Sequence, residues 1–468
     1  MTTFDKPPVT TFQSTIVSEG QAPAAWPTEL EYQASEQQDL APHAGDLHDD
    51  FAFDVAIVGL GYVGLPTALA YHNAGNRVLA VDISQHRLDT IRSRDADLLA
   101  PDRIRLDNAL DDPGFVLTND PWQLERAAAI IVCVPTPVDA HLVPDLRILR
   151  SACAMVIEHA QPGQLTMLTS TSYVGCTEDL LVRPLEEQGF TIGEDIFVAF
   201  SAERINPGND DFSIDVVPRV VGGATAACQD RAATLLHRYT ASVHLVRSLA
   251  AAEMTKLLEN TFRAVNIALA NEFADICRAL DVTVTDVIDA AATKPYGFMP
   301  FTPGPGVGGH CIPCDPHYLL WQLRKEHISA PMITQAMTEI AERPTKVVDR
   351  VREVLSGAGL GMTGARVLVV GVSYKPDVAD LRESPALEII ETLAQRGATV
   401  GYVDPHFASL RLPGGEQVTG VIDPASFSAD LILLHTRHGD QDLSWITPEQ
   451  LVIDGTYRGI DLPQRVLL

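Results

Sequence analysis

The segment FDVAIVGLGYVGLPTALAYHNAGNRVLAVDI, residues 53–83, constrains the fold of this chain more than any other. It consists of an apolar run, a glycine turn, an alanine-rich stretch and a second apolar run that ends at Asp82. That order predicts strand, helix and strand, the βαβ unit of a parallel sheet. Later apolar runs such as AAIIVCVPTP and IFVAFSAER also alternate with helical stretches. We therefore predict an α/β protein that begins with a doubly wound parallel sheet.

The glycines of this unit, Gly59, Gly61 and Gly64, follow the pattern G-x-G-x-x-G between the predicted strand and helix. In this pattern the first glycine permits a tight turn, the second lets the backbone approach a pyrophosphate and the third lets the helix pack on the strand. Asp82 ends the next strand, where a carboxylate would bind a ribose 2′-hydroxyl and repel a 2′-phosphate. The pattern favours NAD over NADP, and the alternative is a glycine turn that binds nothing. Further cofactor candidates in this region are Tyr62, Val63 and Arg87.

Four segments are expected along the chain. Residues 1–52 are rich in polar residues and proline without periodicity, so we predict a disordered extension. Residues 53–247 are expected to form the NAD-binding Rossmann domain, and residues 347–468 a second, smaller Rossmann-like domain. Between them, residues 248–346 begin with a long helix over Ala250–Leu280 that contains no proline or glycine. Apolar side chains spread around this helix predict a dimer interface; they include Leu257, Phe262, Val265, Ile267 and Leu269.

Composition excludes several classes of partner. The net charge is -27, from 61 acidic and 34 basic side chains, which argues against a nucleic-acid or anionic-membrane surface. No apolar run approaches the roughly 18 residues that cross a bilayer, and the N-terminus does not resemble a signal peptide. Seven cysteines without framework spacing predict reduced thiols. We therefore predict a cytoplasmic protein.

The segment GPGVGGHCIPCDPHYLLW, residues 304–321, contains a C-x-x-C pair that three chemistries could use. A zinc site would draw His310, Cys311, Cys314 and His317 from one short loop, although structural zinc sites join two separated ligand pairs. A redox pair of the thioredoxin type should follow the first strand of its own fold. We therefore predict no metal, and the residues alone leave a nucleophilic Cys311 and an inert loop cysteine equally open. A nucleophilic thiol in an NAD enzyme would indicate oxidation of an aldehyde through a thioester.

Six motifs together resemble the nucleotide-sugar 6-dehydrogenases, the family of UDP-glucose, UDP-N-acetylglucosamine and UDP-N-acetylmannosamine dehydrogenases. The resemblance covers about Phe53 to Arg458, and the motifs are GLGYVGLP, VPTP, FSAERINPGN, EMTKLLENTFRAVNIALANE, GPGVGGHCIPCDP and SYKPDVADLRESPA. It implies an N-terminal Rossmann domain for NAD, a long central dimerising helix and a C-terminal Rossmann-like domain for the sugar nucleotide. It also implies oxidation of the C6 alcohol of a UDP-sugar to a carboxylate with two NAD consumed, by a homodimer or higher homo-oligomer.

The resemblance implies roles for four catalytic candidates. Cys311 matches the family's nucleophile, which attacks the C6 aldehyde. Lys256 and Asn260 match a helical pair that stabilises the developing oxyanion, and their i, i+4 spacing puts them on one helix face. Asp315 matches an acid that activates water or orients the lysine. Without the resemblance, a solvated lysine, a surface asparagine and a turn-forming aspartate would explain the last three equally well.

Glu203 matches the second glutamate of the family pattern P-E-F-x-x-E and is expected to position substrate or water. Ala199 stands where the first glutamate is expected, which leaves the base for thioester hydrolysis open. Two other departures are Val174 and Cys176, where the family commonly has proline and threonine.

The remaining matches concern ligand binding. Thr136 and Thr171 match cofactor-side positions, with a strand-end threonine as the alternative. Arg382 matches a cofactor-contacting arginine, and it precedes Ser384 and Pro385, which have the pattern of a helix N-cap and first residue. Arg458 is a weaker match to a substrate-contacting arginine of the family, and a surface salt bridge would explain it equally well. The substrate-binding candidates are Glu203, Arg204, Lys256, Asn260, Thr302, Pro303, Gly304, Gly306, Gly308, Lys375 and Arg458.

The residues around the nucleophile bear on the sugar. UDP-glucose enzymes commonly have a lysine before the acid, whereas this chain has Cys314 there and His310 before the nucleophile. The run resembles the branch that acts on UDP-2-acetamido sugars, chiefly UDP-N-acetylglucosamine, with UDP-N-acetylmannosamine and then UDP-glucose as alternatives. A function of another class is a non-catalytic sensor of sugar nucleotides or NAD. A binding module has no use for a thiol at the reactive carbon, and this argues against the sensor.

Overall fold

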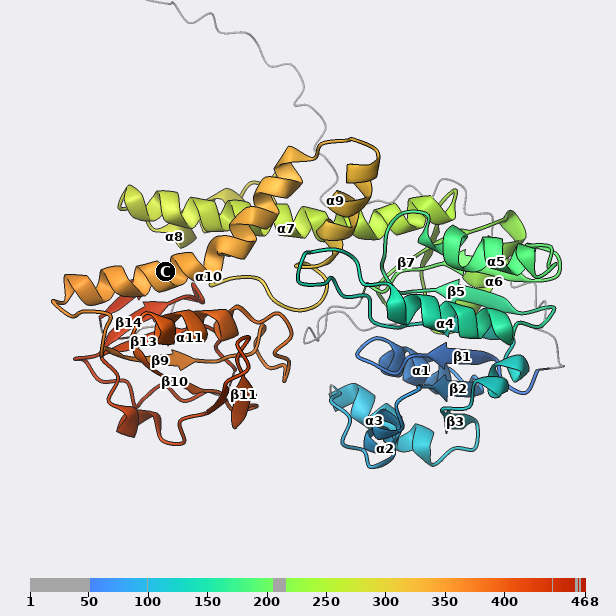
Figure 1. The fold of residues 1–468 in the computed structure, drawn as a ribbon, viewed down its shortest axis with the longest axis horizontal. Helices are drawn as coiled ribbons and strands as arrows, with labels where there is room; N and C mark the ends of the chain where they lie inside the picture. The colour runs from blue at the N-terminus through green and yellow to red at the C-terminus, as the bar shows by residue number, and fades with distance from the viewer. Residues whose placement is uncertain (1–50, 99, 205–215, 440, 459–461, 463) are drawn as a thin grey trace, which may run out of the picture.

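The computed structural model describes residues 51–98, 100–204, 216–439, 441–458, 462 and 464–468. All but the last two residues of the predicted N-terminal extension lie outside this part. Two sheets lie side by side, and the long helix α7 (Leu249–Ala279) runs along both (Figure 1). No helix in the described residues is long and apolar enough to cross a bilayer.

The N-terminal sheet has eight strands in the order β3-β2-β1-β4-β5-β6-β7-β8. Every residue of its five central strands is buried, as expected for a parallel sheet that helices cover on both faces. The difference from a wholly parallel sheet is that β7 pairs antiparallel with β6, so β7 and β8 run opposite to the other six strands. A buried apolar run has the same composition in either direction, so the sequence pattern does not encode this reversal. The strands are β1 (Val55–Val58), β2 (Val78–Val81), β3 (Phe115–Thr118), β4 (Ala129–Val132), β5 (Leu165–Leu168), β6 (Phe197–Phe200), β7 (Arg219–Gly223) and β8 (Val243–Leu245).

Helices pack on both faces of this sheet and close two apolar cores. The predicted βαβ unit is confirmed as β1, α1 and β2, with β1 and β2 parallel and Val55 opposite Val78. The helices of this part are α1 (Gly64–Asn73), α2 (Gln85–Arg92), α3 (Ala100–Leu110), η1 (Pro121–Arg126), α4 (Arg147–Glu158), η2 (Glu178–Val182), α5 (Arg183–Glu187) and α6 (Ala226–Leu236).

The predicted long helix is confirmed as α7, a helix of 31 residues. It begins where the Ser248 side chain accepts a hydrogen bond from the Ala251 N–H, a normal N-cap. The middle of the chain continues with α8 (Val284–Ala292), α9 (Asp315–Lys325) and α10 (Pro331–Gly357). The predicted start of the last domain, residue 347, falls within α10.

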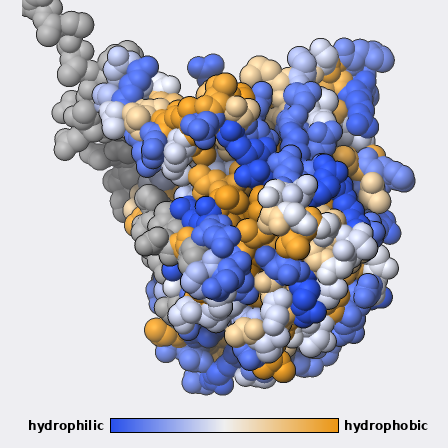
Figure 2. Space-filling view, turned by 90° about the vertical axis from the view of Figure 1, so that its left-hand side faces the viewer, coloured by the Kyte–Doolittle hydropathy of each residue, from blue (hydrophilic) through white to orange (hydrophobic). Residues whose placement is uncertain are grey.

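The C-terminal sheet has five parallel strands in the order β10-β9-β13-β14-β15. With its helices it encloses a separate apolar core. On the end of the molecule that carries this sheet, apolar residues form a broken band among hydrophilic ones (Figure 2). The elements are β9 (Arg366–Val370), α11 (Pro385–Gln395), β10 (Thr399–Val403), the hairpin β11 (Ser409–Arg411) and β12 (Gln417–Thr419), η3 (Pro424–Phe427), β13 (Leu431–Leu434), β14 (Leu451–Asp454) and β15 (Arg465–Leu467).

Candidate active site

The glycine turn between β1 and α1 has the geometry of a dinucleotide site. Gly59 has φ +92°, and a Cβ there would lie 2.6 Å from the Cys133 carbonyl oxygen. A Cβ on Gly64 would lie 1.8 Å from the Gly59 oxygen, whereas one on Gly61 would meet no atom within 4 Å. The first and third glycines therefore serve the turn and the helix packing, and Gly61 leaves open space at the N-terminus of α1.

Asp82 lies at the end of β2, beside this turn. One of its carboxylate oxygens accepts a hydrogen bond of 2.9 Å from the Leu60 N–H, and the other accepts from the Ser84 N–H. The Arg87 guanidinium reaches the Leu60 carbonyl at 2.8 Å. An open glycine, a helix N-terminus and a carboxylate at the next strand end are the features that fit NAD.

Arg382 connects this turn to the C-terminal sheet. Its guanidinium forms a two-pronged ion pair with Asp380, with a shortest distance of 2.6 Å, and lies 4.2 Å from the ring centroid of Tyr62. Tyr62 and Val63 are in the glycine turn itself. The predicted helix start is confirmed, because α11 begins at Pro385 and the Ser384 side chain caps it. Two predicted cofactor residues from different sheets are thus in contact.

Helix α9 is attached to the cofactor side of the N-terminal sheet at two points. The Tyr318 hydroxyl donates to the Thr136 carbonyl. The Gln322 amide donates to the Val174 carbonyl at 2.8 Å and accepts from the Val174 N–H at 3.0 Å. A proline at position 174 could not donate this bond, so the departure from the family pattern has a structural use. Thr171 is half-buried just before this loop.

The predicted catalytic residues come together where α7 meets α9. Cys311 is an exposed residue, and its carbonyl accepts the N–H of Asp315 at 2.8 Å. The buried Asn260 amide donates to the Asp315 carboxylate at 2.5 Å. One helical turn earlier, the Lys256 ammonium donates to the Glu203 carbonyl at 2.7 Å. The structure thus brings together the four catalytic candidates and Glu203.

Burial and charge tune the two reactive groups. Burial raises the pKa of Asp315 to about 6, although Lys256 and the Asn260 hydrogen bond act in the opposite direction. Cys311 is exposed as a whole residue, but burial of its thiol and the charge of Asp315 raise the pKa of that thiol. Lys256, Arg263 and Arg382 oppose that rise. Arg263 is a cation of the site that the sequence analysis missed; its spacing of three residues from Asn260 on α7 was the available signal.

Glu203 is held by a partner that the sequence analysis also missed. Its carboxylate pairs at 2.6 Å with Arg219 of β7, whose side chain is 2% exposed, and also accepts the Arg204 N–H. The signal for this partner in the sequence was the single arginine in the otherwise apolar run that forms β7. Ala199 is fully buried within β6, so a glutamate there would point into the core rather than the site. The alanine therefore removes no carboxylate from the active site.

The glycine-rich loop before Cys311 packs against the C-terminal part of the chain. A Cβ on Gly306 would lie 2.6 Å from Pro385, and one on Gly308 would lie 2.5 Å from the Cβ of Tyr374. The Gly309 N–H donates to the Arg382 carbonyl at 2.9 Å. A side chain at Gly306 or Gly308 would therefore clash with the protein itself, so both glycines are needed for the packing of this loop against the C-terminal part of the chain. Their predicted contact with the substrate stays a prediction.

The other predicted substrate residues lie around this loop. Asn271 of α7 accepts the Gly304 N–H at 2.9 Å, and the buried Arg343 of α10 donates to the Gly304 carbonyl. Pro303 is buried, while Thr302 is exposed and borders a cavity of about 280 Å³ that Tyr457 and Arg465 also line.

Lys375, Arg204 and Arg458 differ in how the structure holds them. Lys375 is half-buried on the loop after β9, where burial and then the charge of Arg263 lower its pKa. The Arg204 guanidinium pairs with Glu259 of α7 at 2.6 Å. Arg458 is exposed, and its backbone N–H donates to the Thr456 hydroxyl.

The zinc hypothesis finds no ligand cluster in the described part of the chain, where no group of three or more His, Cys, Asp or Glu side chains could hold a metal ion. All seven cysteines are unpaired. Cys314 is buried at the start of α9, and burial raises its pKa to about 12.

Comparisons with known proteins agree with this geometry. The UDP-glucose/GDP-mannose dehydrogenase family matches the chain with three models: its NAD binding domain over residues 53–240, its central domain over 250–341 and its UDP binding domain over 368–457. An NDP-N-acetyl-D-galactosaminuronic acid dehydrogenase from Ralstonia solanacearum is 35% identical over 395 residues, or 82% of this chain and 90% of that protein.

Two further relatives differ in substrate. A UDP-N-acetyl-D-glucosamine 6-dehydrogenase from Pseudomonas aeruginosa is 33% identical over 388 residues, or 82% of this chain and 90% of that protein. The solved structure of a UDP-D-ManNAc dehydrogenase from Pyrococcus horikoshii matches with a TM-score of 0.80 and 30% identity, over 88% of this chain and 98% of that one. The chain therefore belongs to the UDP-glucose/GDP-mannose dehydrogenase family and is an NAD-dependent oxidoreductase.

Proposed function

We propose that the protein oxidises carbon C6 of a UDP-2-acetamido sugar, with UDP-N-acetylglucosamine as the favoured substrate, from an alcohol to a carboxylate. One observation carries this proposal: Cys311 is exposed and lies beside the buried Asn260–Asp315 pair, and the loop that carries it packs against Tyr374 and Arg382. A nucleophile, an acid of raised pKa and nearby cations are the groups that two successive oxidations at one carbon require.

The first oxidation converts the C6 alcohol to an aldehyde. When bound, NAD supplies the hydride acceptor for both oxidations. The hydroxyl must lose its proton as hydride leaves C6, and Asp315, with a pKa of about 6, is suited to exchange a proton near neutral pH. The Lys256 ammonium and the Asn260 amide would stabilise the negative charge that develops on the oxygen.

The second oxidation proceeds through sulfur. The Cys311 thiolate attacks the aldehyde carbon and forms a thiohemiacetal, which loses the second hydride and becomes a thioester. Water then adds to the thioester carbonyl, the carbon–sulfur bond breaks, and the carboxylate and the thiol are released. Lys256, Arg263 and Arg382 favour the thiolate that this chemistry needs.

We infer that Asp315, rather than Glu203, takes the proton from the attacking water. Both oxygens of the Glu203 carboxylate are already engaged, one by the Arg219 guanidinium at 2.6 Å and the other by the Arg204 N–H. The Asp315 carboxylate accepts a hydrogen bond from the Asn260 amide, and burial raises its pKa to about 6. Glu203 would then place its own carbonyl and Lys256 rather than move a proton.

The assignment of the sugar has support from the relatives. Proteins of similar identity to this chain are named for N-acetylgalactosaminuronic acid, N-acetylglucosamine and N-acetylmannosamine derivatives, all of them 2-acetamido sugars. The residues His310 and Cys314 around the nucleophile favour the same class over UDP-glucose. UDP-N-acetylmannosamine is the second candidate.

We also propose that α7 forms a homodimer interface. A stripe on this helix exposes apolar side chains at spacings of three, four and seven residues, which place them on one face. The predicted residue Leu257 is instead fully buried in the N-terminal core. The stripe consists of Leu258, Phe262, Leu269, Phe273 and Ile276. Light scattering should give a dimer or a larger assembly, and a double Phe262→Glu, Phe273→Glu variant should give a monomer.

The experiment that tests the function is a panel of UDP-sugars with NAD, followed by the absorbance of NADH. UDP-N-acetylglucosamine should give two NADH per sugar and the highest kcat/KM of the panel. A higher value for another UDP-sugar would correct the substrate. NAD and UDP binding without NADH from any sugar would support the sensor and overturn the proposed oxidation.

A further inference from the structure

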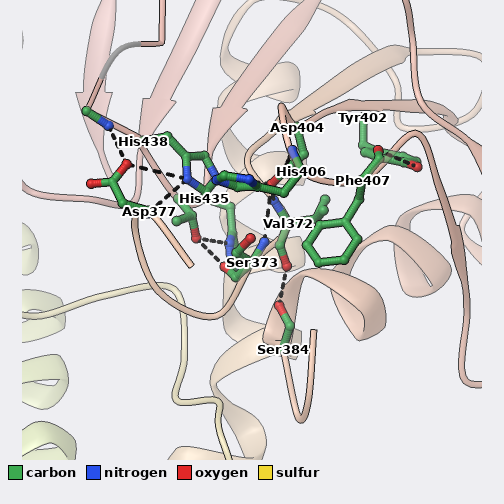
Figure 3. Close-up of polar contacts among 12 residues, drawn as sticks. Val372, Ser373, Asp377, Ser384, Tyr402, Asp404, His406, Phe407, His435 and His438 are labelled. Atoms are coloured by element: carbon green, nitrogen blue, oxygen red, sulfur yellow. Dashed lines mark hydrogen bonds and ion pairs between the residues drawn. The ribbon is translucent and has the colours of Figure 1, made fainter. Parts of the chain in front are cut away.

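The C-terminal sheet carries a buried polar network where its strands end (Figure 3). Asp404 follows β10, and its carboxylate is fully buried. One of its oxygens accepts hydrogen bonds from the Val372 N–H at 2.7 Å and the Ser373 N–H at 3.3 Å. The same oxygen lies 3.1 Å from Nε2 of His438, which follows β13. Three strand ends are thus joined through one carboxylate.

The bonds of His438 define its tautomer. The Asp377 N–H donates to Nδ1 of His438 at 3.0 Å, so Nδ1 is the acceptor. Nε2 therefore carries the proton and donates it to Asp404. The imidazole is 4% exposed and connects Asp404 to the backbone of Asp377.

The segment between these contacts is held at both ends. The backbone of Ser373 is fixed on two sides, because its N–H is bound by Asp404 and its carbonyl accepts the Thr436 hydroxyl at 2.6 Å. Asp377 has φ +60°, a left-handed backbone conformation that is uncommon for residues other than glycine. Its N–H is bound by His438, and its carboxylate accepts the Gly439 N–H at 2.8 Å.

Residues 373–377 therefore form a bridge that is anchored at Ser373 and at Asp377. Lys375 lies at the centre of this bridge, two residues from each anchor. Tyr374, beside it, packs against Gly308 and Gly309 of the loop that carries Cys311. Any displacement of the bridge would therefore move Lys375 relative to the catalytic loop.

We propose that His438 and Asp404 are positioning residues that hold Lys375 where it binds the diphosphate of the UDP-sugar. The inference rests on the proposed function in one respect, that Lys375 contacts the nucleotide. His438 itself acts only through the bridge, since its two ring nitrogens are occupied by Asp404 and Asp377.

The test compares three histidine variants by titration with UDP, without NAD. His438→Ala should weaken UDP binding about tenfold and raise the KM of the UDP-sugar similarly, because a hydrogen bond to a charged group is worth about 1.5–3 kcal/mol. The values of kcat and of the KM for NAD should change less than about threefold. His438→Gln should restore most of the affinity, because its amide offers an acceptor and a donor.

His406→Ala is the matched control. The His406 ring contacts the His438 ring edge to face with centroids 4.7 Å apart, but its side chain makes no hydrogen bond to residues 373–377 among the described residues. This variant should bind UDP like the wild type. Should His438→Ala fail to fold, Asp377→Gly replaces it: glycine accepts φ +60° without strain but loses the carboxylate bond that fixes the bridge.

A double variant gives the decisive result. If His438 acts through Lys375, adding His438→Ala to Lys375→Ala should cause no further loss of UDP affinity. Additive losses, or unchanged UDP binding in either single variant, would overturn the inference. UDP binding that follows the expected pattern without NADH formation would instead overturn the proposed oxidation alone.

Discussion

The two sheets use the same position in opposite ways. In each, an acid at the end of the strand beside the first strand accepts backbone N–H groups from the turn after that first strand: Asp82 binds Leu60 in the N-terminal sheet, and Asp404 binds Val372 in the C-terminal sheet. Asp82 is half-buried next to the open space at Gly61, whereas the side chain of Asp404 is fully buried and its carboxylate contacts His438.

This difference shows how one fold serves two functions. An open strand edge with an accessible carboxylate can bind a dinucleotide. Once a histidine covers the carboxylate, the same edge becomes a rigid support, and the loop after β9 is available to face the active site. The C-terminal sheet therefore keeps the architecture of a dinucleotide site without its open crevice.

Neither strand edge carries the proposed nucleophile, so we expect the largest loss of activity from a substitution of Cys311. Cys311→Ser should lower acid formation by more than about a thousandfold, because a serine hydroxyl is a poorer nucleophile and its ester resists hydrolysis. Cys314→Ser should keep most of the activity, since Cys314 is buried and not needed for catalysis. NADH formed per UDP-sugar consumed is the measurement. Equal loss in both variants, or stoichiometric zinc in the wild type, would contradict the assignment of Cys311 as sole nucleophile.

The open space at Gly61 predicts the second-largest effect, a loss of NAD affinity. Gly61→Leu places a side chain where no protein atom lies within 4 Å, so the fold should be kept while the approach of the NAD pyrophosphate is blocked. We expect the KM for NAD to rise about a hundredfold with an unchanged Tm.

Gly371→Ala is the matching substitution in the C-terminal sheet, in the turn after β9. Gly371 has φ +77°, and a Cβ there would lie 1.7 Å from the Thr436 carbonyl oxygen. This variant should therefore have a lower Tm than the wild type. Normal NAD binding by Gly61→Leu would show that the crevice at β1 is not the cofactor site.

Removing the negative charge of Asp82 should alter the preference for NAD over NADP. Asp82→Asn keeps an acceptor for the Leu60 N–H but no longer repels a 2′-phosphate. The ratio of kcat/KM for NAD to that for NADP should fall about tenfold. Asp404→Asn should leave this ratio unchanged and lower the Tm. Equal kcat/KM values for the two cofactors in the wild type would contradict the role of Asp82.

The smallest effect concerns stability against pH. Burial beside the closed crevice lowers the pKa of His435 from 6.5 to about 4. The unfolded chain therefore binds a proton between these values that the folded protein does not, and stability falls as the pH drops from 6.5 toward 4. At pH 5.5 the loss should be about 1 kcal/mol relative to pH 7.5.

Comparison of urea unfolding for the wild type and His435→Asn isolates this contribution. Asparagine cannot be protonated, yet its amide can still donate to Thr436. Asp315, whose pKa is raised from 3.8 to about 6, has the opposite dependence, because its contribution to stability is lost as the pH rises through that range. That term is common to both proteins and cancels. An equal pH dependence in the two would show that His435 does not titrate as expected.

The amino-acid sequence by itself determined the parts of this protein that depend on near neighbours. The glycine turn with Asp82, the 31-residue α7 and the start of α11 at Pro385 were all predictable, because turns, caps and helix length follow from residues a few positions apart. The grouping of Cys311 with Lys256, Asn260 and Asp315 was predictable only through the resemblance to a known family.

Only the tertiary structure decided the contacts between distant segments. The pairing of Glu203 with Arg219, the packing of Gly306 and Gly308 against the C-terminal part, and the His438–Asp404 network join residues 16 to 79 positions apart. Local patterns do not encode such pairs, because the same buried strand can run in either direction and the same glycine can face a ligand or another loop. Packing of whole elements selects among these possibilities, and the sequence pattern of each element alone is compatible with several.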